Sequence, residues 1–156
     1  MAAAAPSQEE LRDLYRELIL DHARNPRNFG KLAEPYHLAE GINPLCGDKL
    51  KVYLQLEEDG QIADASFEGS GCAISIASAS LLTEAVIGMT KDEAIGFFSA
   101  VINSLTGTEA VKNFDLGKLA ALQGVREFPA RVKCATLAWH ALNAAIHDDQ
   151  QTATTE

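Results

Sequence analysis

The feature that most constrains the fold is a strand–turn–strand pattern between residues 50 and 68. Apolar residues occupy every even position from Leu50 to Leu56, and more polar residues occupy the odd positions. This period of two is typical of a strand with one buried face. Asp59-Gly60 then provides a hairpin turn, and the segment 62–68 returns as the partner strand. We expect three of its residues to share the buried face: Ala63, Ala65 and Phe67.

Helical patterns lie on both sides of this hairpin. Ser7–Glu10 has a capping-box pattern and begins a helix that ends near Arg24, before Pro26. A short strand is expected near residues 37–42. Further helices are expected over Cys72–Ile87, from the capping box Thr90–Glu93 to Leu105, over Leu116–Leu122, and onward from Pro129. This order predicts an α+β fold, with a small three-stranded antiparallel sheet packed against about five helices.

The chain is predicted to form one domain over residues 7–147. Apolar residues make up 47% of the sequence, which is enough for a single hydrophobic core. No internal repeat and no linker rich in Pro, Gly or Ser divides it. We expect residues 1–6 and 148–156 to be flexible termini. No apolar run is long enough to span a bilayer.

The formal net charge of −9 argues against nucleic-acid binding, because a nucleic-acid interface needs a basic surface to meet phosphates. It also disfavours an anionic membrane surface. The most basic part of the chain is the first helix with the loop after it, which carries Arg12, Arg16, Arg24 and Arg27. These arginines are interpreted as a solvated helix face or, alternatively, as a docking surface.

Three cysteines are the candidate functional residues, and each is predicted to lie at the end of an element. Cys46 precedes the first long strand, Cys72 lies where a strand gives way to a helix, and Cys134 lies in the first turns of the last helix. An odd number of cysteines favours a reduced, cytoplasmic protein over a disulfide framework. The start of a helix favours a thiolate at Cys72 and Cys134, whereas a buried, inert thiol is the simpler alternative.

If the cysteines converge, Asp48 is the best candidate for a fourth ligand, since only one glycine separates it from Cys46. The alternative for Asp48 is an ordinary turn residue. Three thiolates and a carboxylate around a divalent cation leave two net negative charges, which Arg131 and Lys133 are placed to offset. Sulfur ligands favour zinc or an iron–sulfur cluster. The four histidines are expected to be structural or on the surface.

Three cysteine motifs resemble those of the U-type iron–sulfur assembly proteins, which include the scaffold IscU and the N-terminal domain of NifU. They are Cys46-Gly-Asp48, Gly69–Ser75 around Cys72, and Lys133-Cys134. The stretch Asn25–Gly30 also resembles the family's N-terminal loop. IscU scaffolds have a His before the third cysteine, where this chain has Lys133, and a chaperone-binding stretch where this chain has Glu127–Arg131. With extra length around Asn103–Val125, the chain resembles the SufU branch.

This resemblance implies a zinc site formed by Cys46, Asp48, Cys72 and Cys134. It implies a sulfurtransferase that accepts persulfide sulfur from a SufS-type, PLP-dependent cysteine desulfurase and relays it to downstream Suf assembly proteins. Such a chain acts as the desulfurase's partner, so its standing as an enzyme is left open. Cys46 is expected to accept the sulfur, and Arg131 to stabilise the charge of the thiolate or persulfide. The departures from IscU argue against an Hsp70-type chaperone partner.

Two other functions remain open at this point. One is a scaffold that assembles a [2Fe–2S] cluster on the same ligands, with iron in place of zinc. The other is a structural zinc protein without sulfur chemistry. The 88 residues between Cys46 and Cys134 disfavour the latter, because structural zinc usually has short ligand spacings in a small fold.

Overall fold

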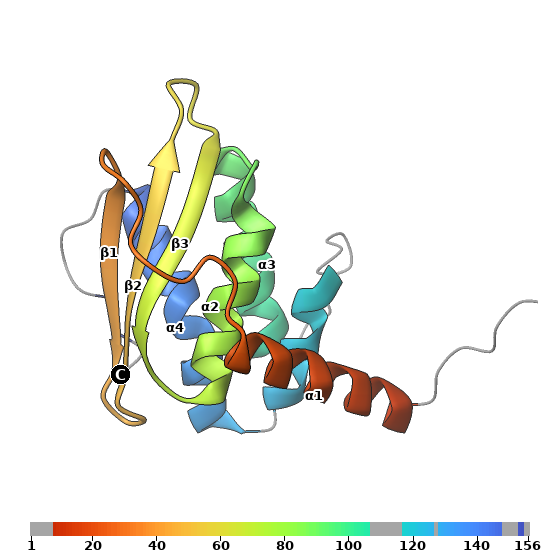
Figure 1. Cartoon of the computed structure of the whole chain (residues 1–156). Helices are drawn as coiled ribbons and strands as arrows, with labels where there is room; N and C mark the ends of the chain where they lie inside the picture. Colours follow the sequence, from red (N-terminus) through yellow and green to blue (C-terminus); the bar gives the residue numbers. More distant parts are fainter. Residues whose placement is uncertain (1–7, 107–116, 127, 148–152, 155–156) are drawn as a thin grey trace, which may run out of the picture.

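The computed structural model describes residues 8–106, 117–126, 128–147 and 153–154. In chain order the elements are α1 (Gln8–Arg24), β1 (His37–Asn43), β2 (Asp48–Leu56), β3 (Ile62–Ser70), α2 (Ala73–Val86), α3 (Lys91–Thr106), the 3₁₀ helix η1 (Gly117–Val125), α4 (Pro129–Ile146) and β4 (Ala153–Thr154). The sheet lies along one side of the molecule and the helices on the other (Figure 1). The predicted α+β class is confirmed.

The sheet has the order β3-β2-β1-β4. Strands β1, β2 and β3 are antiparallel, as predicted. The two-residue strand β4 adds a parallel pairing at the β1 edge, with Ala153 opposite Gly41. It lies within the 148–156 segment that was predicted to be a flexible terminus; residues 148–152, 155–156 and 1–6 lie outside the described part, so that prediction stays open.

The β2–β3 hairpin contains a bulge that the sequence pattern did not reveal. Leu56 pairs with Ile62 whereas Gln55 pairs with Asp64, so Ala63 is an extra residue on β3. The bulge changes which side chains face the core: Ile62 is fully buried, and Ala63 is exposed. The prediction was therefore correct for Ala65 and Phe67, which are buried, and wrong for Ala63.

Helix α4 covers the inner face of the sheet, and α2 packs against α4 (Figure 1). Leu50, Val52 and Leu54 are fully buried on this side. A Cβ added to Gly41 would lie 3.0 Å from the Leu137 side chain, so the glycine lets β1 and α4 approach closely. Trp139 is fully buried and its indole Nε1 donates to Ser78 Oγ at 3.1 Å, which joins α4 to α2.

The segment between α1 and β1 crosses the outer face of the sheet (Figure 1). The Gln55 amide donates to Ala33 O at 2.7 Å, and the rings of Tyr36 and Tyr53 lie 5.0 Å apart. Tyr53 is only 2% exposed, and its hydroxyl donates to Glu68. Burial, and secondly this hydrogen bond, raise the pKa of Tyr53. Alternation alone placed Tyr53 on the polar face, and the crossing segment is what buries it.

The helix boundaries follow the local signals closely. Thr90 and Glu93 form the predicted capping box, in which each side chain accepts the other's backbone N–H at 3.2 Å. The described residues contain four α-helices rather than about five, because the short fifth segment folds as the 3₁₀ helix η1. Glycines at both ends of that segment, Gly117 and Gly124, disfavour a regular α-helix there.

His22 joins α1 to α2 in the interior. It is fully buried, its Nδ1 lies 2.7 Å from Ser80 Oγ, and its Nε2 lies 3.5 Å from Glu84 Oε1. Burial, with a smaller effect from Arg27, lowers the pKa of His22, so the neutral ring is favoured. In the part of the chain that the structure describes, no helix is both long and apolar enough to cross a membrane.

Candidate metal centre

Three ends of secondary structure meet at one end of the sheet. They are the β1–β2 turn with Cys46, the junction of β3 and α2 with Cys72, and the first turns of α4 with Cys134; all three lie at the lower end of Figure 1. The antiparallel register fixes the turn, since Asn43 pairs directly with Asp48. The element ends that carry the three cysteines thus come together, which was the condition set for a shared metal site.

The ligand atoms of Cys46, Asp48 and Cys134 lie within 4.8 Å of one another. The sulfurs of Cys134 and Cys46 are 3.2 Å apart, and all three cysteines are free thiols. Cys46 is exposed, whereas Asp48 and Cys134 are buried. The cluster therefore has two enclosed ligands and one, Cys46, that is partly open to solvent.

Cys72 takes part in the site through its backbone. It is the N-cap residue of α2, and its backbone N–H donates to Asp48 Oδ1 at 2.9 Å. Its thiol is half-buried and lies outside the group of three ligand atoms, although it is near enough to Cys134 to contribute to raising the pKa of that residue. The role of Cys72 as the fourth ligand stays a prediction.

Asp48 is held in place by several donors. Its Oδ1 accepts hydrogen bonds from the Cys72 N–H and, at 3.2 Å, from Ser75 Oγ. Its Oδ2 accepts one longer bond of 3.3 Å, from Asn43 Nδ2. Oδ2 is therefore the oxygen with more capacity left for a cation. Gly71 makes this arrangement possible, because a Cβ there would lie 2.6 Å from Asp48 Oδ1 and 2.3 Å from Ser75 Oγ.

Asn43 and Ser75 are site residues that the sequence analysis did not identify. Asn43 is fully buried, and its Nδ2 also donates to Cys134 Sγ at 3.5 Å. Ser75 is fully buried, and its single hydroxyl proton is shared between Asp48 Oδ1 and the Cys72 carbonyl, which lies 3.0 Å from Ser75 Oγ. The only sequence signal was position: Asn43 lies in the same loop as Cys46, and Ser75 lies three residues after Cys72. Their contacts depend on tertiary structure.

The electrostatics of the cluster favour occupation by a cation. Burial, and secondly the contact with Cys46, raise the pKa of Cys134, so its thiolate is unfavourable without a positive charge nearby. This differs from the expectation of a helix-stabilised thiolate, because Cys134 lies beyond the first turn of α4, which begins at Pro129. Arg131 is exposed at the same site, where Cys72 and then Cys134 raise its pKa.

The surroundings of Cys46 are apolar as well as charged. Leu45 is 68% exposed and Phe128, the N-cap residue of α4, is 58% exposed. Large exposed side chains of this kind are typical of surfaces that contact another protein. Leu45 lies in the turn that carries Cys46, and Phe128 lies at the start of the helix that carries Cys134.

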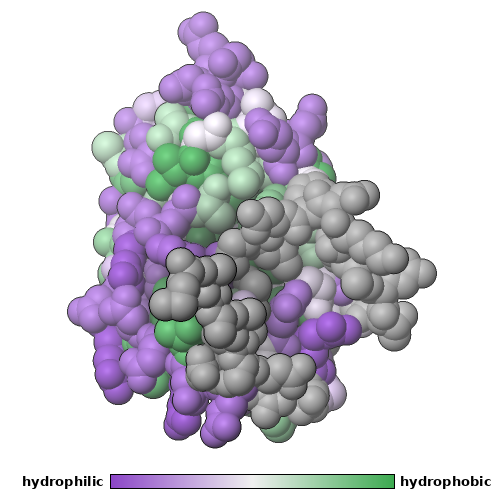
Figure 2. All heavy atoms as spheres, turned by 90° about the vertical axis from the view of Figure 1, so that its right-hand side faces the viewer, coloured by the Kyte–Doolittle hydropathy of each residue, from purple (hydrophilic) through white to green (hydrophobic). Residues whose placement is uncertain are grey.

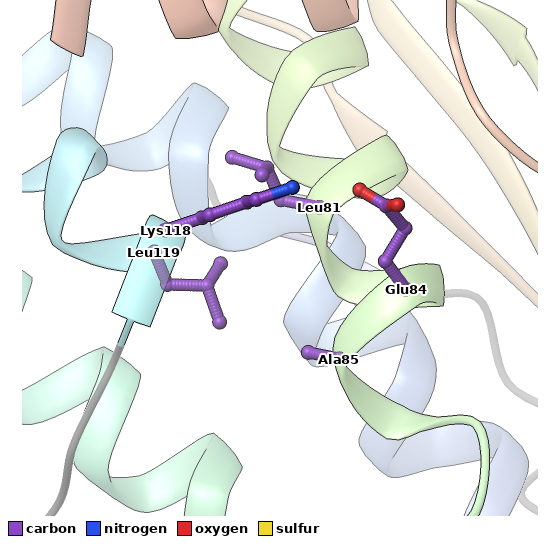
Figure 3. Close-up of a pocket in the computed structure, with 5 residues that line it drawn as sticks. All are labelled: Leu81, Glu84, Ala85, Lys118 and Leu119. Atoms are coloured by element: carbon purple, nitrogen blue, oxygen red, sulfur yellow. The ribbon is translucent and has the colours of Figure 1, made fainter. Parts of the chain in front are cut away.

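Two hollows elsewhere on the molecule contain none of the cysteines. One, of about 330 Å³, lies between α2 and η1 and is lined by Leu81, Glu84, Ala85, Lys118 and Leu119 (Figure 3). In the view of Figure 2, the part that is not drawn in grey has an apolar area in its upper half, with hydrophilic residues around it. The other hollow, of about 340 Å³, is lined by Phe29, Lys49, Lys51, Glu68, Gly69 and Ser70. The cysteine cluster remains the candidate site.

The donor set suits a soft divalent cation. Thiolate sulfur with one carboxylate oxygen is a zinc-type ligand set, and it disfavours magnesium and calcium, which need mostly oxygen ligands. Zn–S bonds of about 2.3 Å would place two sulfurs roughly 3.8 Å apart in a tetrahedron. The 3.2 Å between Cys46 and Cys134 is close to that separation, so a small movement of the Cys46 turn would suffice.

Comparison with known proteins agrees with this geometry. The family model "NifU-like N terminal domain" matches residues 14–135. The zinc-dependent sulfurtransferase SufU of Bacillus subtilis (strain 168) is 42% identical over 137 residues, covering 88% of this chain and 92% of that protein. The iron–sulfur cluster assembly scaffold protein IscU of Streptococcus pyogenes serotype M1 is 39% identical over 137 residues, covering 88% and 85%.

Solved structures share the fold. A protein of Fervidobacterium islandicum AW-1, described as an iron–sulfur cluster assembly scaffold for the SUF system, superposes with a TM-score of 0.77 at 36% identity and covers 83% of this chain and 94% of that one. The N-terminal part of a NifU-like protein from Brucella abortus gives a TM-score of 0.75 at 31% identity, covering 89% and 96%. With its clustered cysteines, its fold and these relatives, the chain belongs to the NifU-like N-terminal domain family of iron–sulfur cluster assembly proteins.

Proposed function

We propose that this chain is a zinc-binding sulfur acceptor, which takes persulfide sulfur from a SufS-type, PLP-dependent cysteine desulfurase in the cytoplasm and relays it to downstream Suf assembly proteins. The observation that carries the proposal is the asymmetry of the cluster. One thiol, that of Cys46, is partly open to solvent, while its neighbours Asp48 and Cys134 are buried. The name of the Bacillus subtilis relative, a zinc-dependent sulfurtransferase, supports the same function.

The metal ligands proposed here are Cys46, Asp48, Cys72 and Cys134. Bound zinc would keep these thiols deprotonated while lowering their reactivity toward other molecules. Asp48 is fixed by three hydrogen-bond donors, and Cys134 is fully buried in the second turn of α4. Both residues are therefore suited to stay in place. Cys46 lies in an exposed turn and is suited to leave the metal when a partner docks.

The transfer step is a thiol–persulfide exchange. The Cys46 thiolate attacks the terminal sulfur of the desulfurase persulfide, and a new S–S bond forms at Cys46. The S–S bond on the desulfurase breaks, and its cysteine leaves as a thiolate, which takes the electron pair. The terminal sulfur moves with its charge or proton, so the exchange needs no external oxidant or reductant.

Arg131 is proposed to stabilise the charge that develops during this exchange. Its exposed guanidinium lies near Cys72 and Cys134, and its interactions with them raise the pKa of Arg131. An arginine stays protonated at all relevant pH values, so it offers a constant positive charge to a thiolate or persulfide. Leu45 and Phe128, exposed near the two sulfurs, are suited to contact the desulfurase around the reacting thiol.

A [2Fe–2S] scaffold is the main alternative, since several relatives carry the name IscU. The observation that favours the relay is Lys133, which stands where IscU scaffolds have a histidine before the third cysteine. A structural zinc protein is a weaker alternative, because most of the core lies far from the cluster, in the packing of the sheet against α2 and α4.

One experiment separates these functions. The zinc-loaded chain is mixed with a PLP-dependent cysteine desulfurase and L-cysteine, and alanine release is measured together with sulfur added to the chain by mass spectrometry. We expect stimulated turnover and one sulfur on Cys46, with both lost in Cys46→Ala. Ser104→Ala, a buried polar change in α3, is the control and should behave as wild type.

Three outcomes would contradict the proposal. The first is no stimulation by the wild-type chain, and the second is equal stimulation by Cys46→Ala. The third is anaerobic assembly of a [2Fe–2S] cluster that displaces zinc and transfers to an apo-acceptor, which would favour the scaffold instead. If Asp48→Ala leaves both zinc content and turnover unchanged, Asp48 is not a ligand.

A further inference from the structure

The side chain of Asn43 connects two of the candidate ligands, Asp48 and Cys134. Its side-chain Nδ2 donates to Asp48 Oδ2 at 3.3 Å and to Cys134 Sγ at 3.5 Å. Asp48 belongs to β2 and Cys134 to α4, and 86 positions separate these two residues in the sequence. Asn43 is itself the last residue of β1. No hydrogen bond links its side chain to Cys46 in the described part of the chain. One amide group therefore links the two enclosed ligands.

The other end of the same amide is unusual. Asn43 is fully buried, yet its Oδ1 has no hydrogen-bond partner among the described residues. A buried, unpaired carbonyl oxygen is destabilising, because it loses its hydrogen bonds to water and gains none in the protein. A residue kept only for stability would not be expected to leave this atom unpaired. The cost is explained if the N–H₂ group serves the site.

The turn itself does not need this side chain. The backbone carbonyl of Asn43 accepts the N–H groups of Cys46 at 3.3 Å and Gly47 at 2.9 Å, and these bonds hold the β1–β2 turn. Every residue type has this backbone carbonyl, so a substitution at position 43 that does not distort the backbone keeps both bonds. The two side-chain hydrogen bonds are thus separable from the turn by mutation.

We propose that Asn43 is a positioning residue, which fixes Asp48 and Cys134 as a rigid pair of metal ligands and leaves Cys46 free to dissociate. Hydrogen bonds from an amide N–H to a carboxylate and a thiolate stabilise their charged forms, which are the forms that bind a metal. This inference rests on the metal-binding part of the proposed function and does not depend on sulfur transfer.

The test is zinc affinity, measured by competition with a chromophoric chelator on Asn43→Ala and Asn43→Leu. The first variant leaves a space and the second fills it, and both remove the N–H donors. We expect both to bind zinc about 10–100-fold more weakly, the range found when a group that orients a metal ligand is lost. The metal-free variants should unfold at nearly the wild-type temperature, as should Ser104→Ala, which should also bind zinc as wild type does.

Double-mutant cycles test the specific contacts. In a Cys46→Ala background, Asn43→Ala should weaken zinc binding by the same factor as in wild type, because the Asn43 side chain makes no hydrogen bond to Cys46 and its backbone bond to Cys46 is kept in both variants. In an Asp48→Ala background the factor should be markedly smaller, because one partner is gone. The thiolate-to-metal absorption of the Co²⁺-substituted protein should shift in Asn43→Ala, since Cys134 loses its donor.

The inference is overturned if either variant that folds binds zinc as tightly as wild type, or if the effect is equal in both backgrounds. Lower zinc affinity that merely tracks a lower unfolding temperature of the metal-free chain would also overturn it, because this result indicates a structural role. A chain whose zinc affinity depends on Asn43 but which does not accept sulfur would contradict the sulfur-acceptor part of the proposed function alone.

Discussion

The Sγ atoms of Cys134 and Cys46 lie 3.2 Å apart, although 88 residues separate them in the chain. A turn between two strands and the start of the last helix bring them together, with Asp48 as the third member of the group. Two thiols this close can share a metal ion or form a disulfide, and the two outcomes exclude each other. Their proximity therefore leads directly to a test of the site.

In metal-free protein, mild oxidation with diamide should link Cys46 to Cys134. A disulfide needs the sulfurs about 2.05 Å apart, so a movement of roughly 1 Å of the exposed turn suffices. Peptide mapping under non-reducing conditions would detect the cross-link. Zinc-loaded protein should resist it, and Cys134→Ala should not form it. A preferred link between Cys72 and Cys46 would contradict the arrangement described.

Removal of the metal should lower the unfolding temperature without unfolding the chain. A ligand present at 1,000 times its dissociation constant stabilises the folded state by about 4 kcal/mol, and chelation removes that contribution. The core residues Leu50, Leu82 and Leu142 are fully buried independently of the cluster. Calorimetry should show one cooperative unfolding transition in each sample, and the transition should lie at a lower temperature with EDTA than without it. Loss of cooperativity in EDTA would support a structural zinc site instead.

Gly71→Ala should disrupt the site, and Gly124→Ala should not. A Cβ at Gly71 would lie 2.3 Å from Ser75 Oγ and 2.6 Å from Asp48 Oδ1, so either the carboxylate or the start of α2 must move. Overpacking of this kind destabilises by about 1–3 kcal/mol, and zinc affinity should fall with it. A Cβ at Gly124 meets nothing within 4 Å, and unfolding should change by less than about 0.5 kcal/mol.

Denaturant unfolding and chelator competition on both glycine variants would measure these effects. Equal behaviour of the two variants would show that the close approach at Gly71 does not hold Asp48. Wild-type zinc affinity in Gly71→Ala, despite lower stability, would show that Asp48 tolerates displacement.

Local signals in the sequence predicted local structure well. The Thr90–Glu93 capping box forms as expected because both partners lie within one helical turn. The β2–β3 hairpin was predicted from alternation and the Asp59-Gly60 turn. The bulge at Ala63 was not predicted, because no residue type in this strand marks the extra residue. The bulge places Ile62, rather than Ala63, on the buried face.

Features that depend on distant contacts were predicted only in part. Tyr53 is buried by a segment that precedes it by about 20 residues and crosses the sheet, which alternation within β2 cannot reveal. The positions of the three cysteines at element ends indicated only where segments can meet, and Asp48 was named as the further ligand on the condition that they do; the structure brings Cys46, Asp48 and Cys134 together. Asn43 and Ser75 were missed because their contacts with Asp48 depend on the β1–β2 register and on how α2 packs.

Finally, His22 should make the stability of the metal-free chain depend on pH. Burial lowers the pKa of His22 below its ordinary value of about 6.5, so the unfolded chain binds a proton more readily than the folded one. Its contribution to stability is present above pH 6.5 and is lost as pH falls through the lower, folded pKa. Around His22, Glu84 and Asp21 oppose this shift, whereas Arg27 and Lys118 support it.

Unfolding temperatures of metal-free protein between pH 7.5 and 5 would measure the effect, without interference from metal loss at low pH. We expect the temperature to fall with pH in wild type and to fall less in His22→Gln. Burial also lowers the pKa of His140, so His140→Gln should flatten the remaining slope. An unchanged slope in His22→Gln would show that Glu84, 3.5 Å from Nε2, accommodates the protonated ring in the folded state.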